Sequence, residues 1–323
     1  MQPLTDRKII LITRRTRLAE LVVRYNTVTQ ARFYVEHLGA DFSDYLREDE
    51  QYHHAITGAE EILRTLGRVQ VIDRGFLTNF VFGPEDLVVA IGQDGLVANT
   101  LKYLSGQFLV GVNPDPGRWD GKLLPFTVPD LAKIIPEVIL GRRPTRSVTM
   151  AKAVLNNGQS LHAVNDFFIG PRSHISIRYT IGIDGRSEEQ SSSGVIVSTG
   201  LGSSGWLKSL LTGAMGIAQN VNEDGMRRRH KIAGPKNGTP AKSEFPWDAD
   251  HLCFTVREPF PSRTTSTSLV FGRVTPQNPL TLISHMAENG VIFSDGMEKD
   301  FLEFNSGARV AIGLAERKGI LVI

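Results

Sequence analysis

The sequence predicts an α/β domain with a parallel sheet followed by a β-rich domain, and three observations lead to this fold class. Strand-like apolar runs alternate with helical patterns up to about Leu140. After Arg142-Arg143-Pro144 the apolar period becomes two, as in strands with one buried face. The length of 323 residues is enough for two domains. We therefore expect the α/β domain over residues 1–142 and the β-rich domain over residues 143–323.

The first domain is predicted to alternate strands and helices along the chain. Its predicted strands are short, largely apolar runs, namely Lys8–Thr13, Val69–Ile72, Leu87–Ile91 and Phe108–Val112. Its helices have apolar residues at helical spacing and end close to a glycine, the usual residue after a helix. They are Val28–Leu38, Ala59–Leu66, Leu96–Leu104 and Pro129–Leu140. Strands separated by helices in this way form parallel sheets.

The second domain is predicted to consist mostly of antiparallel strands. Val148–Leu155 and Ser160–Val164 flank Asn156-Asn157-Gly158-Gln159, whose Asn-Gly step predicts a hairpin. From Ile175 to Ile183 apolar residues alternate regularly before Asp184-Gly185. The remaining predicted strands are Val195–Val197, Cys253–Val256, Leu280–Ser284, Val291–Phe293 and Val310–Ile312.

One long polar segment interrupts the second domain, over residues 219–249. It contains Arg227–Lys231 ("RRRHK") and several glycine and proline residues, and it has no apolar period. We interpret it as a mobile surface loop. A basic flap that covers phosphates is the alternative.

Composition and charge exclude several classes of protein. The chain has 36 basic and 34 acidic residues and a net charge of +2, which is not typical of proteins that bind nucleic acids or acidic membranes. Its one cysteine, Cys253, rules out an internal disulfide and a cysteine-rich metal site. No apolar run approaches the roughly 18 residues that a membrane span needs. We expect a soluble, cytoplasmic protein.

A single carboxylate stands between glycines where a buried strand should become a helix. Asp94 lies in Gly92-Gln93-Asp94-Gly95, directly after the strand Leu87–Ile91. Ligands of open α/β sheets bind at the carboxyl ends of strands, and the start of a helix binds anions through free N–H groups. A carboxylate there would repel a phosphate unless it accepts a proton from a hydroxyl or holds a bridging cation. An ordinary Asp-Gly turn with a helix cap is the alternative.

Two further stretches place polar residues next to strands. Asn165-Asp166 follows a strand-like pattern, and a β-turn is the alternative interpretation there. Later, Val195–Val197 runs into Ser198–Gly205 and then into a helical segment with Trp206. Hydroxyls and glycines ahead of a helix indicate contacts with a nucleotide. A flexible linker is the alternative, and the apolar residues on both sides disfavour it.

These three stretches, in this order, resemble the motifs of the NAD kinase family. That family carries Gly-Gly-Asp-Gly, then Asn-Glu, then a strand that leads into Ser-Thr-Pro-Thr-Gly-Ser-Thr-Ala-Tyr. The matching residues here are Gly92–Gly95, Asn165-Asp166 and Ser198–Trp206. The sequence is most similar to the mitochondrial-type members, from about residue 8 to the end of the chain. The features shared with that type are Asn113–Arg118, Ser192-Ser193-Gly194, Arg257-Glu258-Pro259 and the later Asp295-Gly296.

The resemblance implies a kinase that transfers a phosphoryl group from ATP to the 2′-hydroxyl of the adenosine ribose of NAD, which gives NADP. Asp94 would be the catalytic proton acceptor, and Gly92 and Gly95 would let phosphates approach the backbone. The other residues implied to bind the nucleotide are Asn165, Asp166, Thr199, Gly202, Ser203, Ser204, Gly205 and Trp206. The family also implies a divalent cation, Mg²⁺, and homodimers or higher homo-oligomers. No residue is assigned as a metal ligand.

Two departures from the family pattern keep alternatives open. Gln93 replaces a glycine, which would cost about 1–2 kcal/mol if this position needed a positive φ. Leu96 replaces a threonine and removes a hydroxyl near the expected phosphate site. One alternative is a lipid or sugar kinase of the same superfamily, although the stretch Ser192–Trp206 favours NAD. The other is a non-catalytic nucleotide sensor, which Gln93 and Leu96 favour.

Overall fold

The computed structural model describes residues 4–223 and 244–323. The chain divides into two compact units, each with its own core. The first comprises Met1–Ser147 and Gly319–Ile323, and the second comprises Val148–Lys318. No helix in the described parts of the chain is long and apolar enough to cross a membrane.

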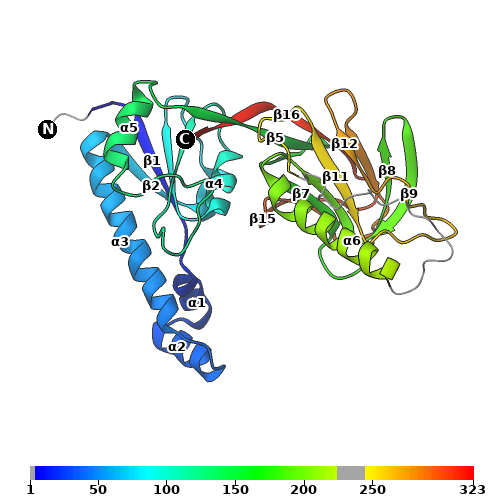
Figure 1. The fold of residues 1–323 in the computed structure, drawn as a ribbon, viewed down its shortest axis with the longest axis horizontal. Coiled ribbons are helices and arrows are strands. Elements are labelled where there is room, and N and C mark those ends of the chain that lie inside the picture. The colour runs from blue at the N-terminus through cyan, green and yellow to red at the C-terminus, as the bar shows by residue number, and fades with distance from the viewer. Residues whose placement is uncertain (1–3, 224–243) are drawn as a thin grey trace. The chain divides into compact units, whose positions relative to one another are not determined.

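A parallel sheet forms the centre of the first unit (Figure 1). Its strand order is β2-β1-β3-β4, and β1 pairs in parallel with both β2 and β3. The strands β1 and β3 are almost entirely buried because helices cover both faces of the sheet. The bounds are β1 Lys8–Thr13, β2 Arg68–Asp73, β3 Leu87–Ile91 and β4 Phe108–Val112.

Helices pack on this sheet through apolar stripes. Helix α3 (Ser43–Leu66) and helix α5 (Leu131–Ile139) share one core with the strands, and Ala59, Leu63 and Ile135 are fully buried in it. Helix α4 (Asp94–Leu101) contacts β3, β4 and the 3₁₀ turn η1 (Arg74–Asn79). Figure 1 shows α4 on the face of the sheet away from α3 and α5. Helices α1 (Arg17–Tyr25) and α2 (Val28–His37) form a hairpin beside the first half of α3.

The last strand, β16 (Arg309–Val322), begins in the second unit and ends in the first. Its residues Ile320 and Leu321 pair in parallel with Phe108 and Leu109 of β4. The chain terminus thus extends the parallel sheet. The sequence did not indicate this return.

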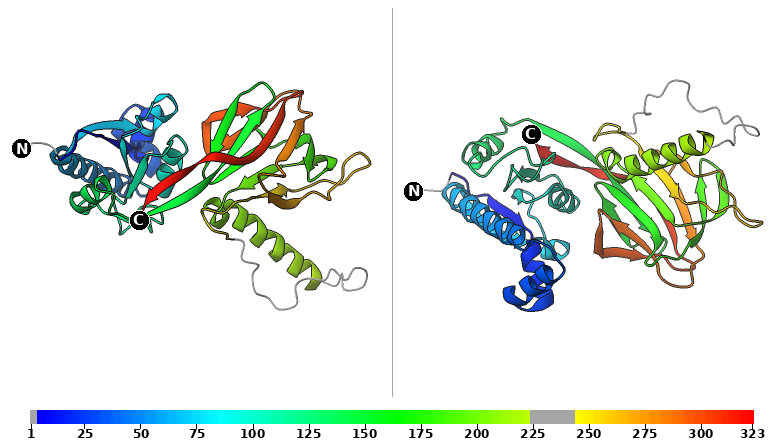
Figure 2. Two further views of the ribbon diagram at one scale, coloured as in Figure 1. Left: turned by 90° about the horizontal axis from the view of Figure 1, so that it is seen from above. Right: turned by 60° about the horizontal axis from the view of Figure 1, so that its bottom comes forward.

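The second unit contains two sheets that enclose one core, as the views in Figure 2 show. The first sheet is antiparallel in the order β16-β13-β8-β9, and β5 pairs with both β16 and β6. Its further bounds are β5 Thr145–Leu155, β6 Ser160–Ala163, β8 Ile177–Ile183, β9 Arg186–Ser192 and β13 Leu280–Ser284. Gly158 and Gly185, at the β5–β6 and β8–β9 turns, have φ values of 85° and 70°, which glycine adopts easily.

The second sheet has the order β12-β11-β10-β7-β14-β15. Alternate residues such as Phe167, Ile169, Val195 and Val197 face the shared core. The bounds are β7 Asp166–Pro171, β10 Gly194–Ser198, β11 Leu252–Arg257, β12 Phe271–Val274, β14 Gly290–Ser294 and β15 Met297–Glu303. After β10 the chain makes the 3₁₀ turn η2 (Gly202–Ser204) and enters helix α6 (Trp206–Glu223).

The predicted fold class, an α/β unit followed by β-rich structure, is confirmed. All predicted helices and strands are present, but α1, β7, β9, β12 and β15 were not predicted. Helix α3 is also much longer than predicted, because its first two turns carry mostly charged residues and little apolar period. The strand β9 has the sequence RSEEQSS, so its polar composition concealed it.

The expected polar loop over residues 219–249 needs a correction at its first end. Helix α6 continues to Glu223, so the first part of the segment is helical. At the other end the Trp247 carbonyl accepts a hydrogen bond from the Thr149 N–H at 2.8 Å, and the Pro246 carbonyl packs against Gly200. Arg227–Lys231 lie outside the described residues.

We predict that the return of β16 depends on a glycine. A Cβ on Gly319 would lie 2.5 Å from Cγ of Leu101, which is buried, so Gly319→Ala overpacks the first unit. The expected loss is about 1–3 kcal/mol of unfolding free energy. Gly313→Ala in the same strand is the control, since nothing lies within 4 Å of that Cβ position. Urea unfolding of both variants measures the difference, and equal stabilities would contradict the packing.

Candidate functional site

Asp94 is the first residue of helix α4 and directly follows the turn after β3. Gln93 is the residue before the helix, with φ −117° and ψ 163°, which is extended backbone. Because this φ is negative, glutamine carries no left-handed strain at this position. The backbone therefore gives no reason for Gln93 to disrupt the turn.

The two oxygens of the Asp94 carboxylate have different surroundings. Oδ1 accepts a hydrogen bond from the backbone N–H of Leu123 at 2.8 Å. The other oxygen has no hydrogen bond to the described residues, and the side chain is partly exposed. One oxygen thus orients the carboxylate, and the other can accept a hydrogen bond from a ligand or contact a cation.

The segment that carries Leu123 folds back over β4. The Asn113 N–H donates to the Phe126 carbonyl at 2.7 Å, and the Asn113 side chain donates to the Trp119 carbonyl at 2.9 Å. A Cβ on Gly111 would lie 2.0 Å from the Leu123 carbonyl oxygen. Only a glycine at position 111 lets Leu123 come close enough to bond Asp94.

The two glycines beside Asp94 have different roles. A Cβ on Gly92 would lie 2.9 Å from the end of the buried Leu96 side chain, so packing alone accounts for a small residue there. Gly95 is exposed, and no atom of residues 4–223 or 244–323 lies within 4 Å of its Cβ position. Its φ is not positive either. Neither packing nor conformation explains the glycine at position 95, whereas close approach of a ligand would.

Charged side chains form a connected set at the carboxyl end of β1. Glu48 accepts from Arg14 at 3.0 Å and from Arg17, and Asp44 accepts from Arg17 at 2.7 Å. Asp44 also binds both terminal nitrogens of Arg118, at 2.6 and 3.1 Å. The hydrogen bonds from Arg118 and Arg17 hold the pKa of Asp44 well below its usual value. Burial opposes the ionised form of Glu48, but the two arginines outweigh it and lower its pKa.

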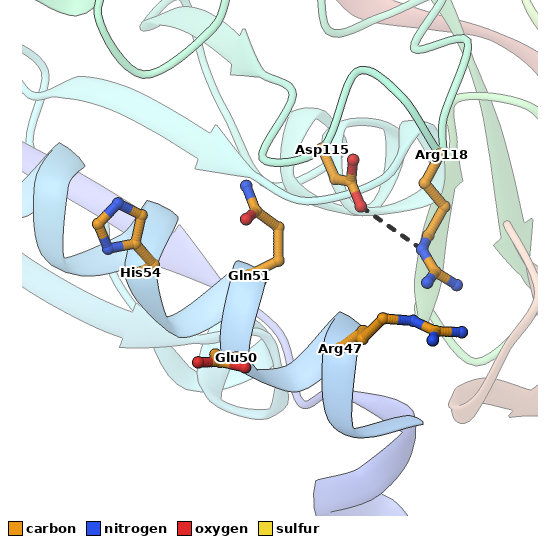
Figure 3. Close-up of a pocket in the computed structure, with 6 residues that line it drawn as sticks. All are labelled: Arg47, Glu50, Gln51, His54, Asp115 and Arg118. Carbon is orange, nitrogen blue, oxygen red and sulfur yellow. Dashed lines mark ion pairs between the residues drawn. The ribbon is translucent and has the colours of Figure 1, made fainter. Parts of the chain in front are cut away.

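A pocket of about 510 Å³ lies next to this ion-pair set (Figure 3). Helix α3 lines one side of it, and the loop after β4 lines the other with Asp115 and Arg118, which form an ion pair at 3.5 Å. The residues from α3 are Arg47, Glu50, Gln51 and His54. Asp115 and Arg118 were noted in the sequence only as part of the shared loop motif Asn113–Arg118.

In the second unit, the two polar stretches lie against each other. The Thr199 N–H donates to the Asn165 carbonyl at 2.9 Å. A Cβ on Gly202 would lie 2.1 Å from the same carbonyl oxygen. The structure thus brings together Asn165, Asp166 and the stretch from Thr199 to Trp206. Gly92, Asp94 and Gly95 belong to the first unit.

Two hydroxyl groups of the stretch from Thr199 to Trp206 form hydrogen bonds with the backbone of the second unit. The buried Thr199 hydroxyl donates to the Val164 carbonyl, and the buried Ser203 hydroxyl donates to the Gly200 carbonyl at 2.7 Å. Ser203 also accepts from the Phe245 N–H at 3.2 Å. These two hydroxyls shape the turn. The residues of the predicted set with exposed surface are Asn165, Asp166, Ser204, Gly205 and Trp206.

Asp166 lies next to a second carboxylate, that of Asp295. Asp295 accepts hydrogen bonds from the N–H groups of Val164, Asn165 and Asp166, of which the bond from Asn165 is 2.6 Å long. Burial, and then the charge of Asp295, raise the pKa of Asp166 to about 7. A carboxyl group in this environment changes charge close to neutral pH.

An aromatic group with an arginine stands beside these residues. The rings of Trp206 and Phe168 stack at 5.7 Å, and the guanidinium of Arg257 lies 5.5 Å from the Trp206 ring and 5.9 Å from the Phe168 ring. No role of Phe168 was predicted from the sequence. The available signal was its place in β7 between the core residues Phe167 and Ile169, which puts it on the opposite face of the sheet.

The described residues offer few ligands for a divalent cation. The described residues contain no group of three or more histidine, cysteine or acidic side chains that could hold a metal ion. A magnesium ion that binds with substrate phosphates needs only one or two carboxylates. The unbonded oxygen of Asp94 fits that requirement.

We predict that Asp166 makes stability depend on pH. Its pKa is about 7 in the folded protein and near 3.8 in the unfolded chain, so its stabilising contribution is lost as pH rises through that window. Asp166→Asn should therefore gain stability over the wild type when pH rises from about 5 to about 8. Urea unfolding at both pH values tests this. A stability difference that does not change with pH would contradict the raised pKa.

Comparisons with known proteins identify the fold. No protein-family model and no curated protein sequence matches the chain. Among solved structures, yeast NADH kinase complexed with NADH has a TM-score of 0.55 and 16% identity, with 98% of this chain and 84% of that chain covered. An NAD kinase from Archaeoglobus fulgidus in complex with ATP has a TM-score of 0.55 and 13% identity, with 98% and 93% covered. The chain therefore has an NAD kinase-like fold.

Proposed function

We propose that the protein is an NAD kinase-like phosphotransferase, which transfers a phosphoryl group from ATP to the 2′-hydroxyl of the adenosine ribose of NAD and yields NADP. The observation that carries this proposal is the Asp94 carboxylate at the end of β3. Leu123 fixes one of its oxygens, and the other bonds none of the described residues. The likeness to a kinase structure with NADH and to another with ATP supports the pairing of substrates.

Asp94 has the position and chemistry of a group that orients a nucleophile. Phosphoryl transfer depends mainly on positioning and on neutralising charge. In this proposal the unbonded oxygen accepts the 2′-hydroxyl proton, while the Leu123 N–H keeps the carboxylate from rotating.

The start of helix α4 has the chemistry to receive the donor phosphates. The first N–H groups of a helix, here those of Asp94 and Gly95, have no intrahelical acceptor and favour anions. The exposed Gly95 leaves room for phosphate oxygens to reach them. Magnesium, when bound, neutralises charge on the transferring phosphoryl group.

Recognition of the dinucleotide falls to the second unit in this proposal. Asn165 and Asp166 are partly exposed and can hydrogen-bond hydroxyl or amide groups of NAD. Trp206 is 37% exposed and stacks on Phe168 next to Arg257. A flat aromatic ring next to a guanidinium is suited to stacking a heteroaromatic ring.

The resemblance to the NAD kinase family also underlies a proposal about the oligomeric state and the cellular location of the protein. We propose that the protein is a homodimer or higher homo-oligomer in the cytoplasm, with nucleotides as its small-molecule partners. Light scattering of the purified protein tests the first part, and a monomer at micromolar concentration would contradict it. Fluorescence imaging of the tagged protein in its host tests the second, and a signal outside the cytoplasm would contradict it.

One observation bears on the non-catalytic alternative. Leu96 is 1% exposed and packs against Gly92, so it offers no polar atom to a phosphate. Gln93, in contrast, adopts ordinary extended backbone and gives the alternative no support. Assay of the wild type for NADP formation separates a kinase from a nucleotide sensor.

We predict that Asp94→Asn lowers turnover by about two orders of magnitude or more, the scale of a positioned base. The amide oxygen can still accept the Leu123 N–H, so the fold and NAD binding should persist. NADP formation and NAD affinity are the measurements. Asp120→Asn, an exposed aspartate on the loop after β4, is the control for lost charge. Near-normal turnover of Asp94→Asn would rule out the assigned role.

We predict opposite effects of Gly95→Ala on stability and on activity. Alanine favours a helix over glycine by up to about 1 kcal/mol, and the Cβ position is free, so the melting temperature should not fall. The added methyl group stands where donor phosphates approach, so the KM for ATP should rise. Gly58→Ala in α3 is the control, because its Cβ meets only an ordinary contact at 3.5 Å. An unchanged KM for ATP would contradict phosphate binding at α4.

A further inference from the structure

Arg14 presents an unsatisfied donor next to the start of helix α4. It follows β1, and its side chain is only 10% exposed. Its Nε is buried and has no hydrogen-bond partner among the described residues. The Cβ position of Gly92 lies 3.7 Å from this Nε. The guanidinium therefore stands at the turn that leads into α4.

Three contacts hold Arg14 in this position. Its Nη2 donates to Glu48 at 3.0 Å, and its guanidinium lies 5.0 Å above the ring of Tyr52. The Tyr52 hydroxyl accepts from the Arg14 N–H and donates to the Ile91 carbonyl, both at 2.9 Å. Tyr52 thus ties the end of β1 to the end of β3, and Arg14 is fixed beside the turn before any ligand arrives.

The guanidinium retains capacity to bind an anion. Its Nη1 donates to the Arg15 carbonyl on the exposed side, at 2.9 Å, and its Nε has no partner in the described part of the chain. Glu48 is shared with Arg17, so one carboxylate is bonded to two guanidinium groups. An arginine fork binds phosphate oxygens through two donors at once.

We propose that Arg14 and the amino end of helix α4 form one binding site for the linear polyphosphate of the phosphoryl donor. Two independent features point to this ligand, the free N–H groups at Asp94 and Gly95 and the partnerless Nε of Arg14 beside Gly92. Phosphate oxygens enter from the exposed side and replace the Arg15 carbonyl as partner of the fork. This site rests on the proposed function and extends it, because the Arg14 guanidinium joins the N–H groups of α4 in binding the phosphates. Leu96 supplies no polar group there, whereas Arg14 has a buried donor without a partner among the described residues.

The proposal is tested with inorganic tripolyphosphate, ATP and NAD as separate probes. The variants are Arg14→Gln, Arg14→Lys and Arg15→Gln, the last being an exposed neighbour with the same loss of charge. For Arg14→Gln we expect the Kd for tripolyphosphate and the KM for ATP to rise by about tenfold or more, the scale of a hydrogen bond to a charged group. The KM for NAD should change less than about twofold. Arg14→Lys should be intermediate because it keeps the charge and loses the fork. Arg15→Gln should match the wild type.

The outcomes separate this site from the proposed function. If the wild type forms NADP and Arg14→Gln keeps its tripolyphosphate affinity and its KM for ATP, the site is refuted and the function stands. If no NADP forms but Arg14→Gln loses tripolyphosphate binding, the anion site stands and the function fails. Tight binding of ATP but not of tripolyphosphate to the wild type would show that the base and ribose carry recognition, and would overturn the proposal. Should Arg14→Gln fail to fold, Arg14→Lys decides, because it keeps a cation next to Glu48; an unchanged KM for ATP then refutes the site.

Discussion

The hydrogen bond from the Leu123 N–H to the Asp94 carboxylate is the interaction on which the first unit's site depends. It forms only because β4 carries Gly111, where a side chain would collide with the Leu123 carbonyl. Two contacts hold the loop that makes this bond. The Asn113 side chain donates to the Trp119 carbonyl of the same loop, and Arg118 forms an ion pair with Asp44 of helix α3. A carboxylate restrained through one oxygen keeps the other available at a defined place, which is what orientation of a nucleophile requires.

The glycines of the site divide into two kinds, and the division separates structure from function. A Cβ atom added to Gly111 would lie 2.0 Å from a backbone carbonyl oxygen, and one added to Gly202 would lie 2.1 Å from another. Packing therefore requires glycine at both positions. Gly95 has open space around it and an ordinary φ. A glycine-rich turn therefore does not indicate a ligand by itself. Gly95, which packing leaves unexplained, stands directly after Asp94.

The sequence predicted the strand-to-helix turn at Asp94 and the order of the two units, because buried strands and period-two patterns leave a strong signal. It did not predict contacts between distant segments. Nothing near Asp94 in the sequence indicates Leu123, and nothing near Asp166 shows that Asp295 accepts its N–H. The sequence also did not show that the backbone of Gln93 is extended, with a negative φ. Thr199 and Ser203 looked like ligand contacts, but their hydroxyls bond backbone carbonyls inside the unit.

The most direct test of the proposed chemistry follows the acceptor hydroxyl itself. The protein is incubated with ATP labelled at the γ-phosphate and with either NAD or NAD that lacks the 2′-hydroxyl on the adenosine ribose. The account predicts label transfer to NAD alone, with a product that an NADP-dependent dehydrogenase can reduce. Equal transfer to the deoxy compound, or none to NAD, would contradict it.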